Sequence, residues 1–239
     1  MIDLHSRYVE FLNLSYCKIG KQTIDILSSI FTKNSVNISG LKISGNNIGD
    51  KLFSDLCLGI SKNTFLLKLW SADNDLEKVA CTILGTVLRY DKKIQFLDLS
   101  SNKFDDEMIG NLFRGLISNS KLETLILNNN NLTNKSVKIL ETTLQINTTL
   151  KNLFLERNKL TNVSCEYIST IFNKNMFIEI VSIAANKIDV DGTDIILERQ
   201  RKIPIKIIDK IEYFRLKVVE SDINLLYEYF WVKVQFYIL

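Results

Sequence analysis

Apolar residues recur along this chain in a short pattern that returns about every 28 residues. The clearest copy runs from Leu122 to Leu132, with leucine at the first, fourth, sixth and eleventh positions and asparagine at the ninth. The ninth-position residues are Cys17, Asn46, Asn74, Asn102, Asn130, Asn158 and Asn186, separated by one gap of 29 residues and five gaps of 28. Because alternate strand residues face the same side, the fourth and sixth positions predict a short strand with one buried face.

The strand positions are apolar in almost every copy of the pattern. The fourth, sixth and eleventh positions hold Leu, Ile, Val or Phe, apart from Ser71 at one sixth position. One such strand cannot bury its apolar face alone, whereas stacked copies form a continuous core. The ninth-position asparagine can bond backbone groups of the bend that would otherwise be buried and unpaired, and cysteine is an accepted alternative there.

The second half of each copy predicts a helix. Apolar residues lie seven, ten and fourteen positions after the asparagine, as at Ile109, Leu112 and Leu116. Spacings of three and four place these side chains on one helical stripe. The seventeenth position after the anchor holds a small polar residue that suits the turn after a helix. These residues are Asn34, Asn63, Asp91, Asn119, Asn147 and Asn175.

A strand and a full helix within 28 residues resemble the ribonuclease-inhibitor-like class of leucine-rich repeats. The stretch Asn147–Leu160, NTTLKNLFLERNKL, is especially similar to that class, and the resemblance extends from about Val9 to Lys202. It implies an α/β fold: a right-handed α/β solenoid, the leucine-rich repeat horseshoe, with parallel strands on the concave face and helices on the convex face. Relatives of this class include the repeat domains of NOD-like receptors and Ran GTPase-activating proteins.

The repeat predicts one elongated unit followed by a different C-terminal segment. We expect seven repeats in residues 1–205 and a non-repeating cap in residues 206–239, which begins shortly after the only proline, Pro204. The end of the chain is rich in aromatic residues, including Trp231. Because the open end of a solenoid exposes core, capping is the preferred interpretation. Binding of a partner, or dimerisation through this tail, is the alternative.

Composition narrows the classes of partner and location. The 239-residue chain is 46% hydrophobic and has a formal net charge of +3 without a long basic run, so we expect neither nucleic acid nor membrane as a partner. We also expect a monomer. The first eight residues contain no apolar stretch typical of a signal peptide. The expected location is the cytoplasm, with the nucleus or delivery into a host cell as alternatives.

The sequence contains no convergent set of catalytic or metal-binding groups. We therefore predict no catalytic residue, no cofactor and no metal site. The single histidine, His5, precedes the first predicted strand. The four cysteines follow the repeat rather than a ligand spacing, so we interpret them as small buried thiols at packing positions.

Large side chains at positions that should face the concavity suggest a binding surface. In the resembling fold these positions include the third, fifth, seventh and eighth of each repeat. A protein-binding face is predicted around Trp70, Ile126 and Phe154, and the remaining candidates are Lys42, Phe96, Asp98, Glu156 and Arg157. The alternative interpretation is that these are scattered surface residues, partly covered by their neighbours.

Two functional hypotheses from different classes follow. The first is a non-catalytic module that binds a protein partner on its concave face. The second is a GTPase-activating protein resembling the Ran GTPase activators, which would supply a polar residue to another protein's active site. That family typically has a strongly acidic tail, whereas residues 206–239 contain five acidic and five basic side chains.

Overall fold

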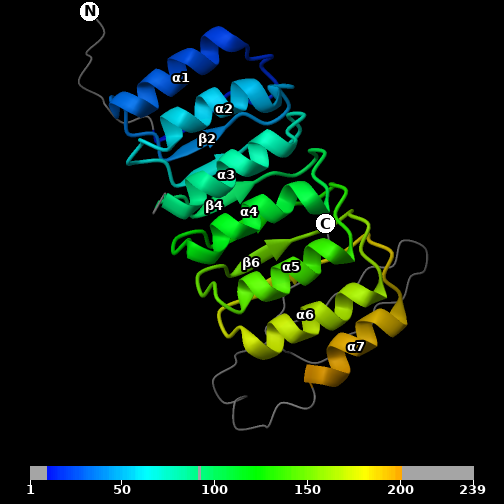
Figure 1. The fold of residues 1–239 in the computed structure, drawn as a ribbon. Helices are drawn as coiled ribbons and strands as arrows, with labels where there is room; N and C mark the ends of the chain where they lie inside the picture. The colour runs from blue at the N-terminus through cyan, green and yellow to red at the C-terminus, as the bar shows by residue number, and fades with distance from the viewer. Residues whose placement is uncertain (1–9, 91–92, 201–239) are drawn as a thin grey trace, which may run out of the picture.

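Strands and helices alternate strictly along the chain. The computed structural model describes residues 10–90 and 93–200, which form seven strands and seven helices (Figure 1). The elements are β1 (Phe11–Asn13), α1 (Lys21–Lys33), β2 (Gly40–Lys42), α2 (Gly49–Ile60), β3 (Lys68–Trp70), α3 (Lys78–Tyr90), β4 (Phe96–Asp98), α4 (Asp106–Ser118), β5 (Thr124–Ile126), α5 (Asn134–Leu144), β6 (Asn152–Phe154), α6 (Asn162–Lys174), β7 (Ile180–Ser182) and α7 (Val190–Gln200).

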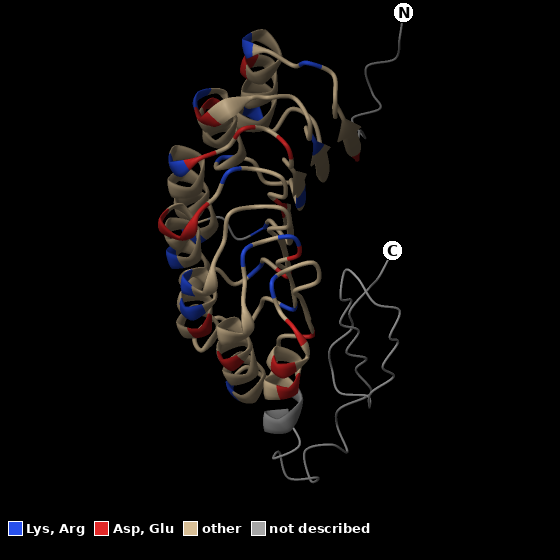
Figure 2. Ribbon diagram, turned by 90° about the vertical axis from the view of Figure 1, so that its right-hand side faces the viewer, with Lys and Arg blue, Asp and Glu red and all other residues tan. Residues whose placement is uncertain are grey.

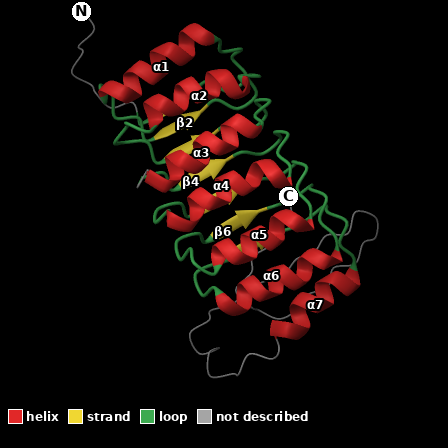
Figure 3. Ribbon diagram, viewed as in Figure 1, coloured by secondary structure: helices red, strands yellow, loops and turns green. Residues whose placement is uncertain are grey.

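The strands form a single parallel sheet in chain order, from β1 to β7. Each strand is three residues long and pairs with the next at the same repeat position, so that Leu69 lies beside Leu97 and Leu97 beside Leu125. The helices form a second layer on one side of this sheet (Figure 3). Figure 2 shows the chain from the side, with the helices on the outer side of its curve and the strands on the inner side. The predicted α/β solenoid is confirmed.

The core lies between the sheet and the helices. The fourth-position residues from Leu41 to Val181 are fully buried, as is the helical stripe Ile109, Leu112 and Leu116. Ser71, the one polar sixth-position residue, is also fully buried, and its hydroxyl donates to the carbonyl of Asp98 in the next strand at 3.2 Å. The core therefore tolerates a serine at this position, because its hydroxyl group is hydrogen-bonded.

The ninth-position asparagines form a ladder along one edge of the solenoid. The amide nitrogen of Asn130 donates to the carbonyls of Leu99, Leu127 and Asn128, at 3.1–3.2 Å. Its side-chain oxygen accepts from the backbone N–H of Phe104 in the preceding repeat, at 3.2 Å. Each asparagine thus satisfies backbone groups of its own repeat and of the one before, and fixes their stacking.

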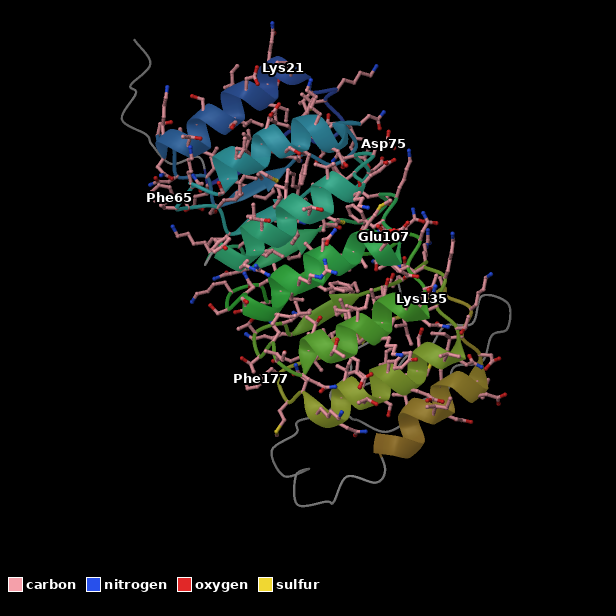
Figure 4. The ribbon with its side chains drawn as sticks, in the orientation of Figure 1. Lys21, Phe65, Asp75, Glu107, Lys135 and Phe177 are labelled. Carbon is pink, nitrogen blue, oxygen red and sulfur yellow. The ribbon has the colours of Figure 1, made fainter. Side chains whose placement is uncertain are left out.

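A second ladder, formed by the asparagines after the helices, lies at the opposite edge. Asn147 is buried and donates to the carbonyls of Leu116 and Asn119, while its oxygen accepts from Leu150 N. Asn63, Asn119 and Asn175 make equivalent bonds. Figure 4 shows the two edges: Asp75, which follows an anchor, lies at one, and Phe65 and Phe177, which each follow a turn asparagine by two residues, lie at the other.

A third set of contacts caps helices across the repeat boundary. The Asp106 carboxylate, in the first turn of α4, accepts from the backbone N–H of Thr133 at 2.8 Å and from the hydroxyls of Thr133 and Ser136 at the start of α5. Asp50, Asn134 and Asn162 occupy the same position and accept from the following repeat in the same way.

The capping series is interrupted at Lys78, since a lysine has no acceptor. Its ammonium group instead contacts Glu107 at 2.7 Å. The helix α4 is capped within its own repeat by Asp105, which accepts from Met108 N at 2.9 Å.

The prediction for the cysteines is wrong at one position, and the predicted C-terminal cap is not tested. Cys57, Cys81 and Cys165 are buried as predicted, but Cys17 is exposed. Among the described residues its thiol donates to the carbonyl of Ser15 within its own bend, at 3.4 Å, and makes no hydrogen bond to another repeat of the kind the asparagines make. The predicted cap in residues 206–239 lies outside the described residues, as does the end of the predicted seventh repeat.

We predict that Asn130→Ala lowers the free energy of unfolding by about 3 kcal/mol, because several backbone groups lose their partner and each unpaired buried group costs about 1–3 kcal/mol. Denaturant unfolding measures this change. The matched control is Asn131→Ala, which removes an exposed neighbouring side chain. Equal stability of the two variants would show that the side chain of Asn130 does not hold the bend.

A second prediction concerns the pH dependence of stability at Asp106. Burial opposes ionisation of this carboxyl group, but hydrogen bonds from the side chains and backbone of Ser136 and Thr133 outweigh burial and lower the pKa below its ordinary value of 3.8. Because the pKa is lower in the folded state, the ionised group stabilises the fold above the unfolded pKa. This stabilisation is lost as pH falls from about 4 through the folded pKa.

We therefore expect Asp106→Asn to show a shallower loss of unfolding free energy than the unsubstituted protein below about pH 4. The asparagine at the equivalent position 134 accepts similar bonds, so the variant should still fold. Urea unfolding across pH 3–7 gives the comparison, with the exposed Asp194→Asn as the control. An unchanged pH slope in Asp106→Asn would contradict the assignment.

Candidate interaction surface on the strands

The register of the sheet places the predicted site residues in rows that cross the strands. The fifth position of each repeat forms one such row, in which every residue pairs with the next. From β2 to β6 the row contains Lys42, Trp70, Asp98, Ile126 and Phe154, and it continues to Asn13 on β1 and Ser182 on β7. The five residues on β2 to β6 are half-buried, whereas the alternating fourth-position residues of the same strands are fully buried. The fifth-position side chains therefore lie on the face opposite the core.

Three aromatic side chains meet in the N-terminal half of this face. The Trp70 ring lies 4.7 Å from the Phe96 ring, centroid to centroid, with an interplanar angle of 39°. It lies 5.6 Å from the Phe11 ring in an edge-to-face arrangement at 71°. These distances and angles are those of favourable aromatic pairs. Phe11 remains 47% exposed, so the cluster presents apolar surface to solvent.

Gly40 permits the contact between Phe11 and Trp70. A Cβ atom at this position would lie 2.7 Å from Cδ2 of Phe11 and 3.6 Å from Cζ3 of Trp70. Gly40 lies on β2, between the strands that hold the two rings. The absence of a side chain on the middle strand therefore lets rings two strands apart touch.

Lysine side chains border the aromatic cluster. The Lys42 ammonium group lies 4.7 Å from the centroid of Trp70 and 5.3 Å from that of Phe11, within the range of cation–π attraction. Lys68 is exposed and lies beside Phe96 in the register of β3 and β4. Within residues 10–90 and 93–200, neither lysine forms an ion pair.

Polar groups in the C-terminal half of the face bond mostly to one another. The Glu156 carboxylate accepts from the hydroxyl of Ser182 at 2.5 Å, and Asn152 donates to Thr124 at 3.0 Å. Lys151 contacts Glu123 at 3.0 Å. Arg157, at the bend after β6, is exposed and has a left-handed backbone conformation with φ of 53°.

The predicted residues are thus divided between two environments. Trp70, Phe96 and Lys42 form one contacting group. In the described part of the chain no ring contact joins Phe154 to that group. Sequence reasoning did not select Phe11, Gly40 or Lys68, although all three occupy the third position of consecutive repeats. Their repeat position could have identified them, because third-position residues lie beside the fifth-position row on the same face of the sheet.

The buried cysteines are poorly suited to nucleophilic chemistry. Burial raises the pKa of the Cys57 thiol well above its usual range, and burial with the charges of Asp50 and Asp105 does the same for Cys81. Burial, followed by the charge of Asp189, raises the pKa of Cys165 to about 12. Neutral thiols are weak nucleophiles.

The described residues were also compared with the requirements of a metal site and of a membrane-spanning helix. In the ranges 10–90 and 93–200 no group of three or more His, Cys, Asp or Glu side chains is arranged to hold a metal ion. None of the helices in that part of the chain has the length and apolar character needed to cross a bilayer. His5 lies outside the described residues.

Comparisons with known proteins agree with the repeat architecture. The family described as Leucine Rich repeat matches residues 5–22, 90–107 and 118–138. Ribonuclease inhibitor from Mus musculus is 32% identical over 95 residues, which cover 39% of this chain and 21% of the inhibitor. The chain therefore spans about one fifth of the length of that relative.

Two solved structures were similar at low sequence identity, and one of them shares the fold. The tropomodulin C-terminal domain from Caenorhabditis elegans superposes with a TM-score of 0.52 at 11% identity, covering 78% of this chain and 99% of that domain. A structure titled Leiomodin-1 Actin-Binding Site 2 gives a TM-score of 0.46 at 13% identity, covering 78% of this chain and 95% of that chain. The first likeness supports the fold alone.

Proposed function

Because the chain is a leucine-rich repeat protein of the ribonuclease-inhibitor-like class, we propose that it is a non-catalytic module that binds a protein partner on its concave face. The repeats suggest a protein-interaction module in general terms. The choice of the concave face rests on one observation: Trp70, Phe11 and Phe96 form a partly exposed aromatic cluster on the strands.

Exposed aromatic clusters favour binding for a physical reason. When a partner covers a tryptophan or phenylalanine that is partly in water, the burial of its apolar surface favours association by about 25 cal/mol per Å². Such residues are enriched among the few that dominate the energy of an interface. The strands hold Trp70 next to Phe11 and Phe96, and the rings contact one another, so little side-chain order has to be created on binding.

The proposed site also includes the C-terminal half of the row, with Ile126 and Phe154 as apolar contacts. Strands of one sheet lie about 4.8 Å apart, so Trp70 and Phe154, three strands apart, should be separated by roughly 14 Å. That span suits a single helix or loop of a partner. Asp98, Glu156 and Arg157 then form a polar border to the apolar contacts.

We predict that Trp70→Ala and Phe154→Ala each weaken partner binding by about 2 kcal/mol, the usual size for a residue that dominates an interface. The free energy of unfolding should change by less, because both side chains lie on the face opposite the core. A partner captured from the source cell, followed by calorimetric titration of each variant, measures the affinity. Denaturant unfolding of the same samples measures the stability.

Leu58→Ala provides the matched control, because Leu58 is a large apolar residue on α2 that is 63% exposed. This variant should bind the partner as tightly as the unsubstituted protein. Unchanged affinity together with lowered stability in Trp70→Ala and Phe154→Ala would make these aromatic residues structural. Weaker binding in Leu58→Ala alone would instead move the interface to the helices.

GTPase activation is a separate proposal and has its own test. Such an activity requires that a polar side chain of this protein complete the active site of a small GTPase. Turnover of GTP by candidate small GTPases, measured with and without this protein, distinguishes the two functions. Faster GTP hydrolysis in the presence of this protein would support GTPase activation and contradict the non-catalytic proposal. Unchanged GTP turnover together with partner binding would support the non-catalytic proposal.

A further inference from the structure

We propose that the binding centre is the N-terminal half of the concave face, and that it recognises a protein segment with a carboxylate next to an aromatic or long aliphatic side chain. This inference rests on the proposed function and names the chemistry of its partner. The site is called here the aromatic-lysine patch. It consists of Phe11, Lys42, Lys68, Trp70 and Phe96.

The apolar part of the patch is preorganised by ring contacts. Trp70 is held between Phe11 on β1 and Phe96 on β4, with centroid distances of 5.6 and 4.7 Å. Gly40 on the intervening strand leaves no Cβ atom to separate Phe11 from Trp70. An apolar side chain of a partner therefore meets rings whose positions are already fixed, which reduces the entropy lost on binding.

The charged part of the patch lacks a partner within the described structure. Lys42 contacts two ring faces but no carboxylate, and Lys68 is exposed without an ion pair in residues 10–90 and 93–200. The nearest acidic neighbour in the row, Asp98, accepts from the backbone and hydroxyl of Ser100, at 3.0 and 2.6 Å. Asp98 keeps its charge, but it lies two strands from Lys42 in the register and forms no ion pair with either lysine in the described residues, so both ammonium groups are available to an external carboxylate.

The other half of the face is less suited to recognise a charged partner. There Glu156 accepts from Ser182, and Lys151 contacts Glu123. These groups already have partners of opposite charge or complementary polarity, whereas the Lys42 ammonium group has no carboxylate partner in residues 10–90 and 93–200. This difference favours the aromatic-lysine patch as the centre.

The required ligand follows from these two parts. A carboxylate that reaches the Lys42 ammonium group forms a charge-assisted hydrogen bond while the rings keep the ammonium group in place. An adjacent aromatic or long aliphatic side chain then covers Phe11, Trp70 and Phe96. The five patch residues lie on four adjacent strands, a span of roughly 14 Å at about 4.8 Å per strand, which matches one short peptide segment.

Selection of a random twelve-residue peptide library on the full chain tests this inference. We expect enrichment of peptides with Asp or Glu next to an aromatic or long aliphatic residue. Synthetic copies of these peptides should bind at least tenfold more weakly to Trp70→Ala and to the double variant Lys42→Glu with Lys68→Glu. Selection on the double variant should instead enrich peptides with Lys or Arg, since the patch charge is reversed. Fluorescence anisotropy measures the affinities.

The variants distinguish failure of this inference from failure of the proposed function. Circular dichroism and melting temperature verify folding. If Trp70→Ala does not fold, binding to the double lysine variant decides, because neither lysine side chain lies in the core between the sheet and the helices. Peptides without an acidic bias, or no enrichment at all, overturn the inference. Binding that is lost in Phe154→Ala but retained in the double lysine variant also overturns it, while the concave-face function stands. Binding retained in all these variants overturns both.

Another copy of this chain is the competing occupant of the patch. Sedimentation velocity of the unsubstituted protein and of Lys42→Glu tests for it. A concentration-dependent dimer that disappears in Lys42→Glu would show that the patch binds a second copy, and would overturn the proposal of an acidic partner. A monomer at all concentrations supports it.

Discussion

The pairing of buried backbone groups by asparagine side chains is the constraint on which the rest of this structure depends. Each repeat turns from strand to helix through a bend whose carbonyl and N–H groups are removed from water. Asn102, for example, donates to carbonyls of two repeats and accepts from the N–H groups of Asn74 and Leu76. Because one amide joins neighbouring repeats, the spacing of 28 residues is a requirement of bonding as well as of packing.

The fixed register determines which side chains face outward. A shift of one residue in any strand would exchange its buried and exposed side chains. The burial of the fourth-position leucine and the hydrogen bonds of the ninth-position asparagine must therefore require the same register. Consecutive repeats have this same register, and Trp70, Asp98 and Ile126 consequently lie side by side. The concave surface is thus a consequence of the core rather than an independent feature.

Features that repeat along the chain could be predicted from the sequence, whereas contacts between particular side chains could not. The period, the strand and helix of each repeat, and the fifth-position row all followed from recurring residue types. The bonds of Asn147 were not predicted in detail, although its column was recognised as a turn. The meeting of Phe11 with Trp70 required the glycine between them and a specific ring orientation. Likewise, the α3–α4 contact depends on Gly85 and Gly115, where an added Cβ would lie 2.3 and 2.0 Å from backbone oxygens.

Hydroxyl-radical footprinting of the full chain with and without its captured partner tests the central claim, that the strands and not the helices form the binding face. The account predicts that oxidation of Phe11, Trp70 and Phe96 decreases in the complex, while oxidation of the exposed helical residues Ile26 and Leu58 stays unchanged. Unchanged oxidation of Trp70 together with protection of Ile26 and Leu58 would contradict the account.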